Sequence, residues 1–172
     1  MPGAHTHPFD KASTNGVLGG CGCPGPSLRL GCAAMSCVEC LRFVTSKEAE
    51  VEELPWGPHE WLARVGLTES KLLQLVRVRM PAGKAHRFHR HPALEEMLYV
   101  VEGRVEQWVG REKRVLGPGE LAHVPVNEVH GSYNVFERPV VFLAILSPAV
   151  FDGPMLIDVS GEEPWRSLKP GP

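Results

Sequence analysis

The sequence predicts an all-β protein, either a sandwich or a barrel. From about residue 70 to residue 147, short apolar segments are separated by glycine, proline and asparagine at turn positions. Apolar and polar residues alternate within these segments with the period of a strand, and none has the convincing pattern of an amphipathic helix. The 172 residues suffice for one domain with a buried core and two tails.

The first clear strand is KLLQLVRVRM, residues 71–80, where Val76, Val78 and Met80 alternate with arginines. Pro81 and Gly83 end it. After a histidine-rich stretch, the remaining strands are expected in EMLYVVEG (96–103), RVEQWVG (104–110), KRVLGPGELAHVPVNEVHGSYNV (113–135) and PVVFLAILSP (139–148). Upstream, VEELPWGPHEWLARVGL (51–67) contains two prolines, so we expect a loop that leads into a first short strand.

The two ends of the chain have a different composition from the middle. Residues 1–45 are rich in Cys, Gly and Pro and are expected to be a disordered tail, followed by a barrel domain over 46–150. Residues 151–172 are expected to be a tail that packs on the barrel through Phe151, Met155 and Trp165.

All five cysteines lie in the first quarter of the chain. Cys32, Cys37 and Cys40 have the C-x4-C-x2-C spacing of a plant-type iron–sulfur loop, but no later cysteine completes it, so Cys21 or Cys23 would have to supply the fourth ligand. We therefore favour a tail without a cluster. An alternative is that translation begins at Met35, so that residues 1–34 are not made.

Charge and hydropathy exclude several classes of function. The formal net charge of −2 gives no basic field for nucleic acid. No apolar run approaches the roughly 20 residues of a membrane-spanning helix, and the N-terminus lacks the pattern of a secretory signal. We expect a soluble, cytoplasmic protein that binds neither nucleic acid nor membranes.

Three histidines stand close together just before the EMLYVVEG segment. His89 and His91 are two residues apart, so on a strand both imidazoles point to one side, about 7 Å apart, and one ion can reach both. His86 falls on the opposite face if the strand is regular. Glu95 and Glu96 follow, and only one of them can face the histidines, but the pattern alone does not say which.

A third imidazole is expected from His130, which follows a turn in which Asn127 can adopt the left-handed conformation. Three histidines and one carboxylate suit a divalent transition metal, namely Fe, Mn, Co, Ni, Cu or Zn. Such a set leaves coordination positions open for water or substrate.

These residues also carry a family resemblance. The sequence resembles the cupin superfamily, whose first motif, G-x5-H-x-H-x3–4-E-x6-G, is matched by Gly83, His89, His91, Glu96 and Gly103. The second motif, G-x5-P-x-G-x2-H-x3-N, is matched from Gly119 to Asn134, with Asn127 where the family usually has glycine. The resemblance covers about residues 70–147. It implies a double-stranded β-helix, or jelly-roll barrel, with His89, His91, Glu96 and His130 as metal ligands, and it selects Glu96 over Glu95.

The inward face of such a barrel would hold a small molecule near the metal. Leu98 and Val100 share the face of Glu96 and should make apolar walls, while Gln107 shares a face with Val105 and Val109 and is a candidate for contact with substrate. A ligand with an oxygen donor on a hydrophobic body would suit this pocket.

The resemblance implies several activities, because metal-binding cupins include dioxygenases, isomerases, decarboxylases, lyases and non-catalytic binding proteins. We favour a dioxygenase-like oxidoreductase, because no separate acid or base stands out in the sequence and an oxygenase needs none. The alternatives are a non-catalytic binding module, or an isomerase or lyase. An isomerase would need a proton carrier such as Tyr133, His86 or His123. A homodimer is expected from the family.

Overall fold

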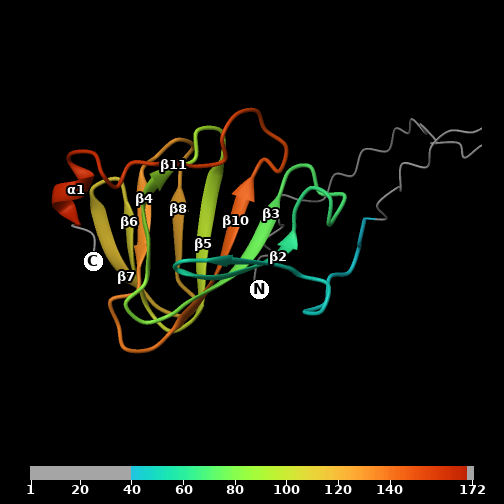
Figure 1. Cartoon of the computed structure of the whole chain (residues 1–172), viewed down its shortest axis with the longest axis horizontal. Helices are drawn as coiled ribbons and strands as arrows, with labels where there is room; N and C mark the ends of the chain where they lie inside the picture. Colours follow the sequence, from blue (N-terminus) through green and yellow to red (C-terminus); the bar gives the residue numbers. More distant parts are fainter. Residues whose placement is uncertain (1–39, 170–172) are drawn as a thin grey trace, which may run out of the picture. The chain divides into compact units, whose positions relative to one another are not determined.

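The computed structural model describes residues 40–169 (Figure 1). Its elements are β1 (Glu50–Leu54), β2 (Gly57–Ala63), β3 (Gln74–Met80), β4 (Ala85–Arg90), β5 (Glu95–Glu102), β6 (Val105–Val109), β7 (Glu112–Leu116), β8 (Leu121–Val124), β9 (His130–Tyr133), β10 (Val140–Ser147), β11 (Ile157–Asp158) and the single-turn helix α1 (Trp165–Leu168). The expected all-β cupin architecture is confirmed. No helix of these residues is long and apolar enough to span a membrane.

The strands form two antiparallel sheets. The six-stranded sheet has the order β1-β2-β3-β10-β5-β8, and the five-stranded sheet has the order β11-β4-β9-β6-β7. Side chains of both sheets meet in the main core, which contains Val78 and Met80 of β3, Val100 of β5, Val105 of β6 and Phe142 of β10. The predicted alternation in β3 is confirmed, since Val76, Val78 and Met80 are buried.

The segment expected to be a loop before the first strand is instead a β-hairpin. β1 pairs with β2 from Glu50↔Trp61 to Leu54↔Gly57, and β2 pairs onward with β3. The prolines allow this because Pro55 lies in the hairpin turn, and Pro58 comes before the first β2–β3 pair, His59↔Val78. The loop prediction gave too much weight to the prolines and too little to the alternation of His59 and Trp61.

The C-terminal segment packs on both sides of the five-stranded sheet. Phe151 and Met155 pack against the main core, and β11 pairs with β4. On the outer face, Trp165 of α1 lies 5.2 Å from Phe88 between ring centroids. α1 therefore covers a second apolar cluster, made of Phe88, Trp108, Tyr133 and Val159.

The N-terminal cysteine prediction falls largely outside the structure. Cys32 and Cys37 precede the described residues, and Cys40 is a half-buried free thiol. Leu41 N–H already donates to Leu67 O at 2.8 Å. Ordered contacts therefore begin upstream of residue 46, where the sequence predicted the barrel to start.

Replacing Asn134 by alanine is expected to destabilise the barrel by about 3 kcal/mol. The buried amide Nδ2 donates to Met80 O at 3.0 Å and to Arg138 O at 2.9 Å, and Oδ1 accepts from Phe136 N–H at 3.2 Å. Alanine would leave three main-chain groups without partners. Urea unfolding measures the loss, with the exposed neighbour Val135→Ala as the control; equal small losses in both variants would contradict the prediction.

Candidate metal centre

Four side chains that lie on or directly after three strands converge in the interior. His89 lies on β4, His91 follows it, Glu96 lies on β5, and His130 opens β9. Their ligand atoms all lie within 4.8 Å of one another, and the residues are 2%, 5%, 7% and 1% exposed, respectively. Bonds of about 2.1 Å to one ion would place ligand atoms up to about 4.2 Å apart. A slight contraction therefore brings the four residues around a single ion.

The backbone fixes the orientation of all three histidines. The Nδ1 atoms donate to main-chain carbonyls: His89 to Arg87 O at 2.7 Å, His91 to Met155 O at 2.6 Å, and His130 to Glu128 O at 3.0 Å. A carbonyl oxygen only accepts, so Nδ1 carries the proton in each neutral ring. Each Nε2 therefore has its lone pair available for a common ion.

Glu96 completes this set. Its Oε2 lies 2.8 Å from His130 Nε2 and 3.6 Å from His91 Nε2. Despite the short distance, the buried His130 Nε2 makes no hydrogen bond of good geometry within the described residues. Burial opposes ionisation of Glu96, but the close approach of His130 and His91 outweighs it and holds the pKa of Glu96 below its ordinary value. The ionised carboxylate of Glu96 and the unpaired Nε2 of His130 face the same point. A cation bound there would be a partner for both.

The choice between the two glutamates follows from strand alternation. Glu96 is buried, whereas the side chain of Glu95 is 47% exposed and lies 3.4 Å from His123 Nε2 on the neighbouring β8. This is the arrangement that the resemblance implied. His123 is at the sheet edge, as expected for a residue outside the site.

His86 is displaced from its expected position by a bulge in β4. Between His86 and His89 the strand advances three residues while β9 advances two, from Ser132 to His130. The extra residue turns His86 to the same side as His89, and their rings stack at 3.7 Å. Trp56 stacks on the other face of His86 at 4.1 Å. The expectation for a regular strand therefore does not apply here.

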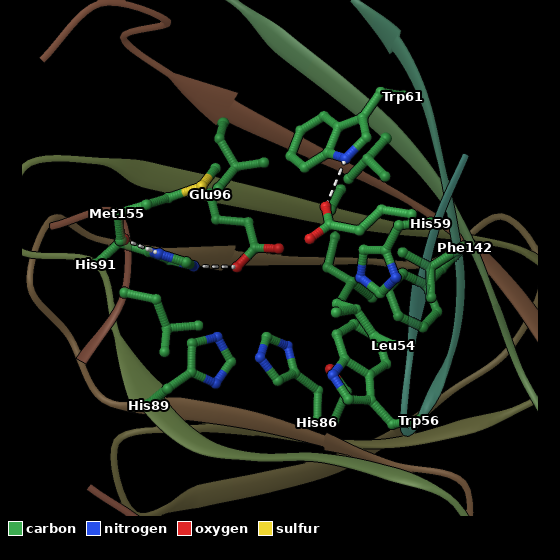
Figure 2. A pocket seen from close by; sticks show the side chains of 18 residues that line it. Leu54, Trp56, His59, Trp61, His86, His89, His91, Glu96, Phe142 and Met155 are labelled. Atoms are coloured by element: carbon green, nitrogen blue, oxygen red, sulfur yellow. Dashed lines mark hydrogen bonds and ion pairs between the residues drawn. The ribbon is translucent and has the colours of Figure 1, made fainter. Parts of the chain in front are cut away.

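The cluster opens into a cavity of about 170 Å³ (Figure 2). The size is comparable to the roughly 150 Å³ of a cavity that holds benzene, so it suits a ligand of about six to ten heavy atoms. Most walls are apolar and come from Leu54, Trp56, Trp61, Val76, Val78, Leu98, Phe142, Ala144, Leu146, Met155 and Leu156. No lysine or arginine among residues 40–169 lines it.

Of the three residues expected in the substrate pocket, Leu98 lines this cavity. Val100 is fully buried in the main core. Gln107 accepts from Ser132 Oγ at 2.6 Å and donates to Trp108 O at 3.0 Å, so protein groups satisfy its amide. Gln107 faces a separate hollow near β7 and β8 and reaches the main cavity only through Ser132.

Sequence reasoning missed the polar residues that the β1–β2 hairpin contributes. Glu52 and His59 line the cavity together with Trp56 and Trp61, and Trp61 Nε1 donates to Glu52 Oε2 at 3.1 Å. The alternation of His59 with Trp61 in HEW was a signal of a strand, and recognising it would have placed both side chains on one face.

Comparison with known proteins supports the same conclusion from outside the structure. A family model described as a cupin domain matches residues 76–146. The pectin degradation protein KdgF of Dickeya dadantii is 30% identical over 91 residues, which are 52% of this chain and 83% of KdgF. The chain belongs to the cupin family.

Other relatives of this cupin differ in how much of them it covers. The dimethylsulfoniopropionate lyase DddQ of Ruegeria pomeroyi is 34% identical over 86 residues, 49% of this cupin but only 42% of the lyase. The structure of KdgF from Halomonas sp. has a TM-score of 0.55 and 25% identity, over 62% of this cupin and 92% of that chain. The polyketide cyclase RemF of Streptomyces resistomycificus, at 20% identity and a TM-score of 0.59 over 76% and 94% of the chains, shares the fold.

We expect the metal-free cupin to lose stability as the pH falls below about 6.5. Burial lowers the pKa of His59 and lowers that of His89 much further. The unfolded chain takes up both protons near the ordinary pKa of about 6.5 while the folded chain does not, so each residue weakens folding by up to about 1.4 kcal/mol per pH unit. Glu96 raises the pKa of His91, which is therefore protonated in both states below pH 6.5 and adds no slope.

Urea unfolding of metal-free protein at about pH 6.5 and about pH 5.5 measures this effect, because above this window the raised pKa of His91 acts in the opposite direction. The lowered pKa of Glu96 does not interfere, because both its folded and its unfolded values lie below this window. A midpoint that stays constant or rises on acidification would contradict the prediction.

Proposed function

We propose that this cupin is a metal-dependent enzyme of the lyase or isomerase type that acts on a small organic molecule with an oxygen donor. The observation that carries the proposal is the buried cluster of His89, His91, Glu96 and His130, which faces a mostly apolar cavity. The donor set fits a divalent transition metal, with Fe, Mn, Co, Ni, Cu and Zn as candidates.

When bound, such a metal would supply a Lewis acid that attracts an oxygen of the ligand and acidifies the neighbouring C–H bond. The protein contributes the rest of the site. Trp56, Phe142 and Leu98 exclude water and hold the apolar body of the ligand. Since no lysine or arginine of the part of the chain that the structure describes lines the cavity, an anionic group of the ligand would find its partner at the cluster end.

Two observations favour the lyase or isomerase type over the dioxygenase that the sequence alone suggested. The relative DddQ is by its name a dimethylsulfoniopropionate lyase, and a small sulfonium carboxylate of that kind is of a size that suits the cavity. The cavity also presents polar side chains apart from the cluster, Glu52 and His59, which an oxygenase would not need. The dioxygenase stays the second candidate, because three neutral histidines in an apolar pocket also suit a redox metal.

The test combines metal analysis with turnover in the presence and absence of oxygen. Protein purified without an affinity metal column is analysed for its metals and then incubated with dimethylsulfoniopropionate, with uronates derived from pectin, and with diols, diketones and flavonols. Product formed under anaerobic conditions supports the proposal. Substrate-dependent oxygen uptake would support the dioxygenase, and bound metal without any turnover would indicate a binding module.

We also propose a homodimer. The outer face of β5 and β8 exposes Met97, Tyr99, Val101 and Leu121, a group of apolar side chains suited to a second copy of the chain. Light scattering after size-exclusion chromatography measures the mass. A Val101→Lys substitution is expected to shift the protein toward the monomer, and a monomeric parent would contradict the proposal.

A further inference from the structure

The β1–β2 hairpin brings a buried imidazole into the cavity that belongs to neither the candidate metal centre nor the apolar core. His59 is 6% exposed and lies on β2, across the cavity from His91 (Figure 2). Its ring meets Trp56 edge to face at 4.1 Å. Within the described chain, it makes no hydrogen bond, ion pair or ring contact with the four residues of the centre.

The backbone fixes which nitrogen of His59 faces the ligand. Nδ1 lies 3.1 Å from Gly57 O, and since a carbonyl only accepts, Nδ1 carries the proton. Nε2 is then a free acceptor, without a hydrogen-bond partner among the described residues, in a side chain that lines the cavity. Burial lowers the pKa of His59, so the ring is neutral at neutral pH and its lone pair is available.

Charged and titratable groups on three elements face this ring. Glu52 of β1 is the direct cross-strand partner of His59, and its carboxylate, held by Trp61, raises the pKa of His59, as Glu96 of β5 also does. His86 of β4 lies close enough for its own pKa to be lowered by His59. A proton on His59 would therefore be stabilised by Glu52, which lies at the exposed end of the cavity.

We propose that His59 is the catalytic base of this cupin, with Nε2 removing a proton from the ligand carbon next to the carbonyl group whose oxygen faces the metal centre. The assignment rests on the proposed function. The proton moves to Nε2, the electron pair of the C–H bond forms a C=C bond to the adjacent carbonyl carbon, and the π pair of the C=O bond moves onto its oxygen. In an elimination the C–H pair instead forms the new C=C bond to the carbon on the other side, the C=O bond is retained, and a group on that carbon leaves with its own bonding pair. No oxidant is consumed.

The other proton carriers considered from the sequence are placed less favourably. His86 is sandwiched between Trp56 and His89, so its ring is engaged on both faces. Tyr133 packs in the second apolar cluster, where burial raises its pKa to about 12. His123 lies at the exposed β8 edge beside Glu95.

Exchange of carbon-bound protons in deuterated water tests the assignment without knowledge of the natural substrate. Pyruvate serves as the probe, because it offers two oxygens to a metal, fits the cavity, and has methyl protons whose loss is followed by proton NMR. The metal-loaded full chain is expected to exchange these protons about 100-fold faster than His59→Gln at equal metal content. His123→Gln, the same substitution at an exposed site, should behave as the parent.

The pH profile separates a base from a merely structural residue. The parent rate should rise as His59 loses its proton and then level off, and Glu52→Gln should move this rise to lower pH by removing a neighbouring negative charge. Equal exchange by the parent and His59→Gln would overturn the assignment, as would a loss of exchange confined to His86→Gln. A parent chain with full metal occupancy but no exchange would overturn only the assignment of His59 as the base. A parent chain that binds no metal would overturn both this assignment and the proposed function.

Discussion

Replacing His130 by alanine is expected to remove nearly all bound metal from this cupin while leaving a folded barrel. His130 is 1% exposed, and its Nε2 lies 2.8 Å from Glu96 Oε2, so it is the innermost member of the set. The loss in metal affinity should exceed the roughly 10- to 100-fold that removing an outer hydrogen-bond partner costs. Elemental analysis after dialysis measures the metal, and circular dichroism verifies the fold.

His91→Ala should have the same effect, because His91 is the ligand that the C-terminal segment orients through Met155 O. Glu95→Ala is the matched control. Glu95 is the neighbour of Glu96 in sequence but faces solvent beside His123, so its loss should leave the metal content unchanged. Stoichiometric metal in both histidine variants, or metal loss in Glu95→Ala, would contradict the assignment of the centre.

Replacing Gly57 by alanine is expected to destabilise the protein by about 2–4 kcal/mol and to disturb the cavity. Gly57 has φ of +135°, and an added Cβ would collide with the carbonyl oxygen of Arg79 and lie 3.2 Å from Pro81 Cδ. The clash can be relieved only by moving β2 away from β3. That shift would displace the Gly57 carbonyl that orients His59.

Gly66 provides a control with a similar backbone strain and no clash. Its φ is +94°, but a Cβ added there would meet no atom within 4 Å, so Gly66→Ala should cost only about 1 kcal/mol. Urea unfolding of both variants gives the difference. Equal losses of unfolding free energy in the two variants would contradict the prediction, because they would show that β2 and β3 can lie equally close with a side chain at position 57.

The positions of the four candidate ligands could be predicted because each depends on local rules. Residues that are two apart on a strand point to the same face, so the side chains of His89 and His91 lie together. Strand alternation implies that only one of Glu95 and Glu96 points inward, and the resemblance to the cupin motifs selected Glu96. Asn127 takes φ of +64° in the turn before β9, as expected for the residue in place of the usual glycine.

The remaining parts of the site depend on contacts between distant segments. His91 is oriented by a carbonyl 64 residues further along the chain, which no local pattern encodes. Gln107 was expected in the pocket because its strand alternates, yet Ser132 from β9 satisfies its amide and keeps it away from the centre.

The sequence by itself determined the all-β fold, the strand that contains Val76, Val78 and Met80, and the four residues that meet at the centre. The strands and the shared face of His89 and His91 follow from periodicity, which acts over a few residues, whereas the choice of Glu96 came from the resemblance to the cupin motifs. Only the tertiary structure decided that the bulge in β4 turns His86 toward His89, and that the β1–β2 hairpin supplies His59 and Glu52. An extra residue in one strand turns the side chains before it to the opposite face of the sheet. The cavity wall that contains His59 and Glu52 forms only once the β1–β2 hairpin pairs with β3.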